Sequence, residues 1–218
     1  MTNDEIARFL RTHPQFFDQH PELLETIYVP HPYGGRAIAL SERQTVALRE
    51  KLRLLEGKLA EIIKFAEEND AIGEKVHRLS VALAGARDFP ALAHSLYFHL
   101  REDFAVPHVA LRVWGKSVPA DFQEAEAVSQ AQRQQAESMA SPQCGSAAGS
   151  VFAPWFGEAA EHVRSLALVP LGAEGEMSAP FGLLALGSED PQRFFPDMGT
   201  LYLRRIGELC AAAATARL

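Results

Sequence analysis

The chain has 218 residues, of which 47% are hydrophobic and 22% are charged, and its formal net charge at pH 7 is −7. This composition is typical of a globular protein with a sizeable core, and the acidic balance argues against nucleic acid as the main partner. Cys144 and Cys210 lack CxxC spacing, which predicts neither a disulfide framework nor a structural zinc site. Without a leader pattern or an apolar run of about 18 residues, we expect a cytoplasmic protein that does not enter a membrane.

Residues 1–40 predict a set of short helices. Thr2 and Glu5 have the spacing of a capping box ahead of an apolar stripe, and Pro14 ends this first helix. The next stretch, PQFFDQHPELLETI, carries aromatic residues and leucines on two or three further helical turns. Helices this short are not stable alone, so we expect them to pack against the following helix or against a partner protein.

Residues 41–85 predict one long helix, coiled-coil-like in its pattern and without proline. It opens on a capping box at Ser41 and Gln44, and its apolar residues recur at steps of three and four. A leucine stripe on so long a helix needs cover from a second chain or from the N-terminal helices. We expect a homodimer, parallel or antiparallel, with these interface residues: Leu48, Leu52, Leu55, Leu59, Ile62, Phe65, Asn69, Ile72 and Val76.

The register of this stripe shifts once. After Ile62 the apolar positions continue through Phe65 with one extra step of three, which is a stammer in a coiled coil. Asn69 then falls on an a position, where it could pair with its symmetry mate and fix the register. Alternatively, the helix ends or kinks near Gly73, and Asn69 lies on the surface. Both interpretations stay open at this point.

Residues 86–218 predict a domain of mixed helices and strands. Pro90 stands at the start of a helix over residues 89–102, and VALRVW predicts a strand over residues 109–114. The other expected elements are an exposed helix in 119–140, a loop or short helix with an aromatic cluster in 141–157, and a terminal helix carrying Leu201, Tyr202, Ile206, Leu209 and Ala213.

Two further strands are predicted by the segments SLALVPLG (165–172) and FGLLALGS (181–188). Both are apolar on both faces, so we expect a sheet that is covered on each side. The fold class predicted for the whole chain is therefore α+β.

The order of these elements, with SLALVPLG followed by PFGLLALGSEDPQRFFPDM, resembles a GAF domain. The whole chain resembles the bacterial family DUF484 through four pieces: FLRTHPQFFDQHPELLETIYVPHPYGG, ALSERQTVALREKLRLLEGKL, the single Asn in FAEEND, and LALGSEDPQRFFPDMGTLYL. This resemblance implies N-terminal helices (1–40), a long dimerisation or signalling helix (41–85) and a GAF-like domain (86–218) whose central antiparallel sheet is covered by helices. It implies no established activity.

GAF domains bind small molecules between the sheet and its covering segments, or dimerise with a collapsed pocket. By this resemblance and by residue type, the candidate ligand-binding residues are Trp114, Cys144, Gly145, Phe152, Trp155, Phe156 and Arg164. No NKxDE motif is present, so neither a cyclic nucleotide nor a bilin is expected.

Each of these candidates also has a structural interpretation. Cys144 could be a reactive thiol if a base such as His162 lay beside it, or a half-buried loop residue. Arg164 could meet an anionic ligand, or be a solvated charge at a strand end. The aromatic residues could wall a ligand site, or form ordinary core.

The sequence lacks the motifs GxSxG, HExxH, GxxxxGK[ST] and GxGxxG, so we expect a protein that is not an enzyme and holds no metal or cofactor. The first hypothesis is a sensory or regulatory module, in which a small ligand of the GAF-like domain acts through the long helix on a dimer interface. The alternative is a scaffolding dimer with an empty pocket that docks a partner protein through its N-terminal helices.

Overall fold

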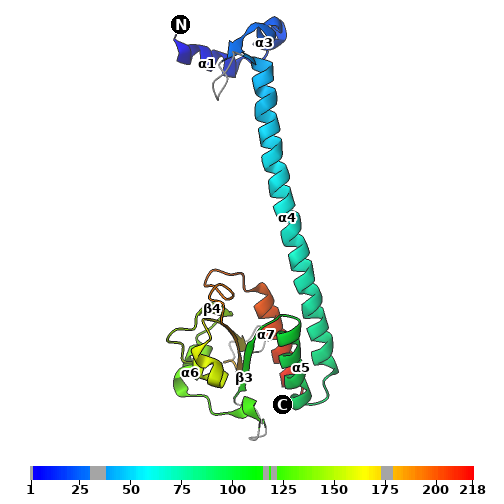
Figure 1. Cartoon of the computed structure of the whole chain (residues 1–218), viewed down its shortest axis with the longest axis vertical. Coiled ribbons are helices and arrows are strands. Elements are labelled where there is room, and N and C mark those ends of the chain that lie inside the picture. The colour runs from blue at the N-terminus through cyan, green and yellow to red at the C-terminus, as the bar shows by residue number, and fades with distance from the viewer. Residues whose placement is uncertain (1, 30–37, 115–117, 119–121, 173–178) are drawn as a thin grey trace. The chain divides into compact units, whose positions relative to one another are not determined.

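The computed structural model describes residues 2–29, 38–114, 118, 122–172 and 179–218 (Figure 1). The chain divides into two compact units, Met1–Glu68 and Asn69–Leu218. The long helix predicted over residues 41–85 is present as α4 (Leu40–Gly85), and it contributes to both units.

The first unit contains short elements before α4. These are α1 (Asn3–Thr12), α2 (Phe16–Gln19), α3 (Glu22–Thr26) and the paired antiparallel strands β1 (Tyr28–Val29) and β2 (Ile38–Ala39). The predicted capping box is formed: the Glu5 amide donates to Thr2 Oγ1 at 3.3 Å, and the Thr2 amide donates to Glu5 Oε2 at 2.7 Å. The turn-rich segment VPHPYGG (29–35), expected from its proline and glycine residues to connect the short helices to the long helix, falls mostly on residues 30–37, which lie outside the described residues.

Aromatic rings hold the short helices of the first unit together. Phe9 stacks on His13 at 4.5 Å between ring centroids, and its edge meets Phe16 at 5.9 Å. Phe16 in turn contacts Phe17 at 5.6 Å and His20 at 4.9 Å. His13 and His20 therefore pack against phenylalanine rings, which adds stabilising contacts to helices too short to persist alone.

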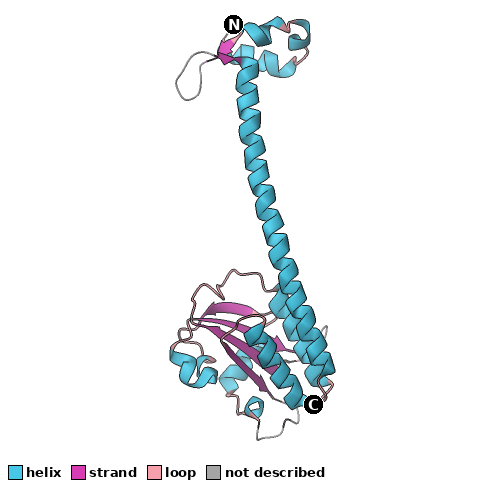
Figure 2. Cartoon of the chain, turned by 45° about the vertical axis from the view of Figure 1, so that its right-hand side comes forward, coloured by secondary structure: helices cyan, strands magenta, loops and turns pink. Residues whose placement is uncertain are grey.

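The second unit is built on a four-stranded antiparallel sheet in the order β3-β6-β5-β4 (Figure 2). Its strands are β3 (His108–Val113), β4 (Gln143–Ser146), β5 (Ser165–Leu171) and β6 (Gly182–Ser188). Its other elements are α5 (Phe89–Glu102), η1 (Gln123–Ala125), α6 (Gln130–Glu137), η2 (Ala153–Glu161) and α7 (Leu201–Thr215).

The sheet is buried on both faces, as its apolar strands predict. On one face Leu111 and Val169 join a core formed with α5, α7 and the end of α4. On the other face Leu168 and Leu183 pack with Phe152 and with residues of α6 and η2. The α+β fold expected from the sequence is therefore confirmed, and Figure 1 shows α5 and α7 on one side of the strands and α6 on the other.

Helix α7 approaches the sheet closely because it carries small residues where it meets β5. A Cβ atom added to Gly207 would lie 2.6 Å from Val169 Cγ1, so no side chain fits there. Cys210, Ala211 and Ala214 are buried further along the same helix. The small residues of α7 thus allow it to pack closely on the sheet.

Two segments differ from the sequence-based expectation. Strand β4 lies in the stretch 141–157, which is predicted as a loop or short helix. Its residues QCGS show no apolar alternation, and backbone pairing with β5 makes it a strand. In the stretch 119–140, η1 and α6 replace a single helix, and α6 begins at a capping box formed by Ser129 and Gln132.

The last part of α4 packs on its own domain. Leu79 and Leu83 are fully buried in the core, and Val76 packs against the same core. The Tyr202 hydroxyl donates to the carbonyl of Asn69 at 2.9 Å, and Arg217 Nη2 donates to the carbonyl of Ala84 at 3.0 Å. From Asn69 onward α4 is thus a structural helix of the second unit, covered by residues of the same chain.

Replacement of Leu83 by Ala should lower the free energy of unfolding by about 2–5 kcal/mol, because it leaves a cavity in a filled core. Val81 lies on the exposed side of the same helix, with 59% of its surface accessible. The matched variant Val81→Ala should change the free energy by less than about 0.5 kcal/mol. Urea unfolding followed by circular dichroism measures both, and equal losses would contradict the packing described here.

Candidate functional site

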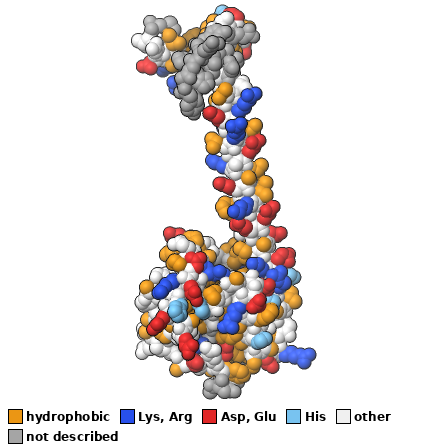
Figure 3. Space-filling model, viewed as in Figure 1, with side chains coloured by type: hydrophobic (Ala, Val, Ile, Leu, Met, Phe, Trp, Pro, Cys, Tyr) orange, Lys and Arg blue, Asp and Glu red, His pale blue; other side chains and the backbone are white. Residues whose placement is uncertain are grey.

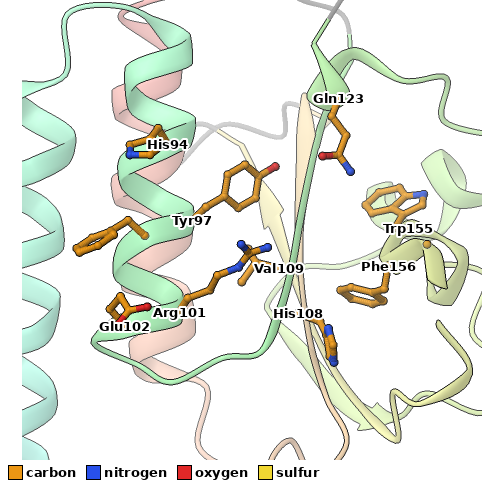
Figure 4. Close-up of a pocket in the computed structure, with 11 residues that line it drawn as sticks. His94, Tyr97, Arg101, Glu102, His108, Val109, Gln123, Trp155 and Phe156 are labelled. Atoms are coloured by element: carbon orange, nitrogen blue, oxygen red, sulfur yellow. The ribbon is translucent and has the colours of Figure 1, made fainter. Parts of the chain in front are cut away.

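The second unit contains a cleft of about 560 Å³ beside strand β3 (Figure 4). Its walls come from α5 on one side and from η2 on the other, with η1 at one end. The lining residues are His94, Tyr97, Phe98, Arg101, Glu102, His108, Val109, Gln123, Trp155, Phe156 and Gly157.

The floor of this cleft is the free edge of the sheet, because β3 is an edge strand. The Trp114 amide donates to the Phe181 carbonyl at 2.7 Å, so the backbone groups of Trp114 point toward β6 and those of Val113 point away from it. Backbone groups alternate between the two sides of an antiparallel strand. The amides and carbonyls of Val109 and Leu111 therefore face the free edge.

Side chains of the same chain cover this edge at Leu111. Arg112 Nη1 donates to the Leu111 carbonyl at 3.0 Å, and the Leu111 backbone forms a hydrogen bond with the Tyr97 hydroxyl. That hydroxyl also donates to Glu124 Oε1 at 2.7 Å. The part of this edge that lines the cleft is the end at Val109.

Burial and the Glu124 carboxylate together raise the pKa of Tyr97 well above its ordinary value. Tyr97 is thus a phenol at every physiological pH, and it acts as the donor in its bond with Glu124. Arg112 is 3% exposed and pairs with Glu126 Oε2 at 2.6 Å. These paired groups form a fixed polar wall between α5, β3 and η1.

The opposite wall is aromatic and held in place. The Trp155 ring meets the Phe152 ring edge to face at 5.1 Å, and the Arg112 guanidinium lies 5.5 Å from the Trp155 ring. Phe156 lies beside it, 6.2 Å from the His108 ring. The cleft therefore combines planar apolar surfaces with hydrogen-bonding groups, as small-molecule sites do.

Arg101 supplies a charge at the cleft that lacks an ion-pair partner among the described residues. Its guanidinium lies 6.0 Å from the Tyr97 ring. His108 lies at the floor, with Nε2 at 3.6 Å from Glu189 Oε1. Figure 4 shows Arg101 reaching from α5 toward β3, while Glu102 lies farther from the strand.

The end of α5 links this region to α4. Asp103 Oδ1 accepts from Arg78 of α4 at 2.9 Å, and Asp103 Oδ2 lies 2.6 Å from His99 Nδ1. Hydrogen bonds from Arg78 and His99 lower the pKa of Asp103 below its ordinary value of 3.8. Asp103 follows Arg101 by two residues, so a short stretch of backbone joins the cleft to the α4 contact.

The structure distributes the seven sequence-predicted site residues over separate places. Trp155 and Phe156 line the cleft, whereas Trp114 and Phe152 are buried in the core on that face of the sheet. Arg164 is exposed, and its amide donates to the Ser188 carbonyl at 2.8 Å.

The remaining two predicted residues, Cys144 and Gly145, lie on β4 and line a separate cavity of about 200 Å³. Burial raises the pKa of the Cys144 thiol to about 11. Within the described part of the chain, no hydrogen bond joins this thiol to His162, the base considered for it. A thiol with a raised pKa and no base is a poor nucleophile near neutral pH.

Sequence reasoning missed the polar half of the cleft: Tyr97, Arg101, His108 and Gln123. Tyr97 and Arg101 are four residues apart on a predicted helix, which places them on one face. That spacing alone does not reveal that the face lies beside a free sheet edge. His94 also lines the cleft, whereas His99, five residues later on the same helix, contacts Asp103.

The order of elements and the antiparallel sheet covered on both faces define the second unit as a GAF-like domain. The chain belongs to the family described as "Protein of unknown function, DUF484", which matches residues 1–216. A curated relative, the uncharacterized protein YigA of Salmonella typhimurium, is 24% identical over 208 residues, covering 92% of this chain and 86% of the relative. The family resemblance found in the sequence is thereby confirmed.

Two solved structures are similar to this chain. The GAF domain of nlh2 from A. aeolicus, in an inactive state, is 16% identical with a TM-score of 0.48, covering 69% of this chain and 99% of that one. The free methionine-R-sulfoxide reductase from Neisseria meningitidis, in complex with its substrate, is 20% identical with a TM-score of 0.47, covering 67% and 89%. Among the described residues, no helix is both long and apolar enough to span a bilayer.

Alkylation of Cys144 by iodoacetamide near neutral pH should be more than about tenfold slower than alkylation of glutathione, because burial depletes the reactive thiolate. Mass spectrometry of the digested protein measures the rate at each cysteine. Cys210 serves as the internal control for folding, since it is fully buried with its pKa raised to about 12 and should react only after unfolding. A Cys144 rate above that of glutathione would contradict this assignment.

The Asp103 contacts should make stability depend on pH in a defined window. A carboxyl whose pKa is lowered on folding stabilises the folded state above its ordinary value of 3.8, and this contribution is lost as the pH falls through the folded pKa. Asp103→Asn should therefore lower the melting temperature near neutral pH, and the difference should shrink below about pH 4. Asp197 is exposed and is the control, because Asp197→Asn should follow the unmodified protein throughout.

Proposed function

We propose that this chain is a regulatory module without catalytic activity, which forms a homodimer through α4 and binds a small molecule in the cleft beside β3. The observation that carries the proposal is the apolar surface that α4 exposes before it reaches the GAF-like domain. Membership of the GAF-like fold class supports a sensory or regulatory role, and the polar and aromatic cleft supports a small ligand.

The exposed segment of α4 is rich in large apolar residues (Figure 3). Each of the following exposes more than half of its surface: Leu48, Leu52, Leu55, Leu59, Ile62 and Phe65. Covering one such side chain contributes about 1.5–3 kcal/mol, so a second copy that covers all of them gains a large stabilisation. A contiguous apolar stripe of this kind indicates an interaction surface.

The spacing of these residues favours a second copy of the same helix as the cover. Leu52 and Leu59 occupy a positions, and Leu48, Leu55 and Ile62 occupy d positions, which is the pattern of a two-stranded coiled coil. The segment from Leu48 to Phe65 is about 26 Å long at 1.5 Å per residue. We infer a short coiled coil whose dimer dissociates on dilution.

The dimer interface proposed here is shorter than the one inferred from sequence. Ile72 and Val76 are half-buried, and Val76 packs against the core of its own domain. Asn69 remains exposed, and its carbonyl is bound by Tyr202. The residues that best fit an intermolecular contact are therefore those from Leu48 to Phe65.

Coupling between cleft and dimer would pass through the end of α5. Arg101 lines the cleft, and Asp103 binds Arg78 of α4. A ligand that displaces Arg101 would alter this contact and thereby the position of α4 on its domain. The register shift near Phe65 lies just before α4 meets the domain, where two helix packings could differ.

The second hypothesis, a scaffolding dimer that docks a partner protein, is favoured by one observation in the first unit. Ile6 and Phe9 lie on α1, and each leaves 41% of its surface exposed. A protein groove that receives an amphipathic helix would cover such residues. This alternative predicts the same dimer and differs in requiring α1 for its activity.

Light scattering coupled to size exclusion should give twice the mass of one chain at micromolar concentration. The double variant Leu55→Glu and Leu59→Glu should be monomeric, because it places charges at adjacent a and d positions. Leu54 is exposed on the same helix but lies outside the a and d positions, so Leu54→Glu should remain dimeric. A monomeric mass for the unsubstituted protein would refute the proposal, and so would a monomeric mass for Leu54→Glu.

A further inference from the structure

We propose that the ligand of the cleft is a planar aromatic anion, bound between Arg101 and the ring of Phe156 over the Val109 end of β3. This inference rests on the proposed function, because it specifies the chemical class of the ligand at the same site. It rests on four features of the cleft: a rigid aromatic wall, an unpaired guanidinium, a short open strand edge and the pairing of nearby carboxylates.

The aromatic wall is set before a ligand arrives. Trp155 is 9% exposed and is fixed by its edge contact with Phe152 and by the guanidinium of Arg112. Phe156 is half-buried next to it and reaches the cleft. Because this wall is already rigid, stacking a ring on it removes little conformational freedom from the protein. A planar ligand therefore binds at low entropic cost.

Arg101 provides the charge that such a ligand must match. Its side chain is exposed, and the described residues offer no carboxylate within 4.0 Å of its guanidinium. The side chain reaches from α5 across the cleft toward Val109 (Figure 4). A planar guanidinium binds a carboxylate or phosphate through two parallel hydrogen bonds, and this favours an anion over a neutral ligand.

Two of the acidic residues nearby are paired, and Glu102, which lines the cleft, is exposed. Glu124 is buried and accepts from Tyr97, and Glu126 pairs with Arg112. Glu189 is exposed and lies 3.6 Å from His108, beyond hydrogen-bond distance, and Glu102 lies on the side of α5 farther from β3. The repulsion of an anion at Arg101 is therefore limited to exposed carboxylates, whose field is screened by solvent.

The open edge of β3 is too short for a peptide strand. Strand addition requires a row of free amides and carbonyls. Here the groups of Leu111 are already bound by Tyr97 and Arg112, and Val109 is the edge-facing residue of β3 that lines the cleft. One donor and one acceptor suit a polar substituent on a small ring, so the geometry selects a small molecule.

Indole-3-carboxylate and its neutral analogue indole-3-carboxamide test this inference on the full-length protein. Amide chemical shifts in nitrogen-15 spectra give both the affinity and the location of binding. The carboxylate should bind at least about tenfold more tightly than the carboxamide, and it should shift the Val109 amide. Arg101→Gln should weaken carboxylate binding by about tenfold and carboxamide binding by a smaller factor, so that the preference disappears.

Two further variants distinguish the roles of ring and charge. Phe156→Ala should weaken both probes by a similar factor, because it removes the ring contact and leaves the guanidinium in place. Arg133 is exposed on α6 away from the cleft, so Arg133→Gln should preserve the tenfold preference. Circular dichroism of each variant confirms that it folds.

The outcomes separate this inference from the proposed function. Equal affinity for both probes, or carboxylate shifts confined to the Cys144 cavity or to the Leu48–Phe65 stripe, would overturn it while leaving the dimer measured by light scattering intact. Response of the Val109 amide to an acetylated Val-Thr-Val-Thr-Val peptide but not to the carboxylate would overturn it in favour of strand addition. A monomer that still prefers the carboxylate would refute only the proposed dimer.

Discussion

The structure depends first on the burial of Leu79 and Leu83, which attach the last part of α4 to the GAF-like domain. Both side chains lie in one continuous core with α5, α7 and one face of the sheet. Since a buried leucine contributes about 1.5–3 kcal/mol, this contact fixes α4 to the domain more strongly than the polar bonds beside it. The bonds from Arg217 and Tyr202 to backbone carbonyls of α4 then set its rotation.

This attachment explains why the leucine stripe changes register. Up to Phe65 the apolar residues are exposed and follow a coiled-coil repeat, whereas from Val76 they face the core of the same domain. The two surfaces differ in geometry: in the proposed dimer the first faces a symmetric partner helix, whereas the second packs in one core with α5 and α7. A single heptad register does not serve both, so the extra step of three marks where one kind of packing replaces the other.

The sequence predicts elements whose apolar pattern decides their structure, and it misses those shaped by backbone pairing. Helix α5 has the predicted bounds because Asp88 and Pro90 mark its start, and strands β5 and β6 lie within one residue of the expected limits. Strand β4 escapes prediction, since QCGS carries no alternation. The sequence predicts two residues of the cleft, Trp155 and Phe156, from their aromatic side chains. It does not predict Arg101 and Tyr97, because only the tertiary arrangement brings them to the edge of β3.

The free edge of β3 is protected from pairing with another strand in two ways. An exposed strand edge invites pairing with another chain, and proteins discourage it with covering residues or charges. Tyr97 and Arg112 cover the edge at Leu111 through hydrogen bonds. At Val109 the edge is left open, and the charge of Arg101 stands over it instead. A charge at this point discourages pairing with another apolar strand, and in the proposed binding mode the same charge receives a small anion.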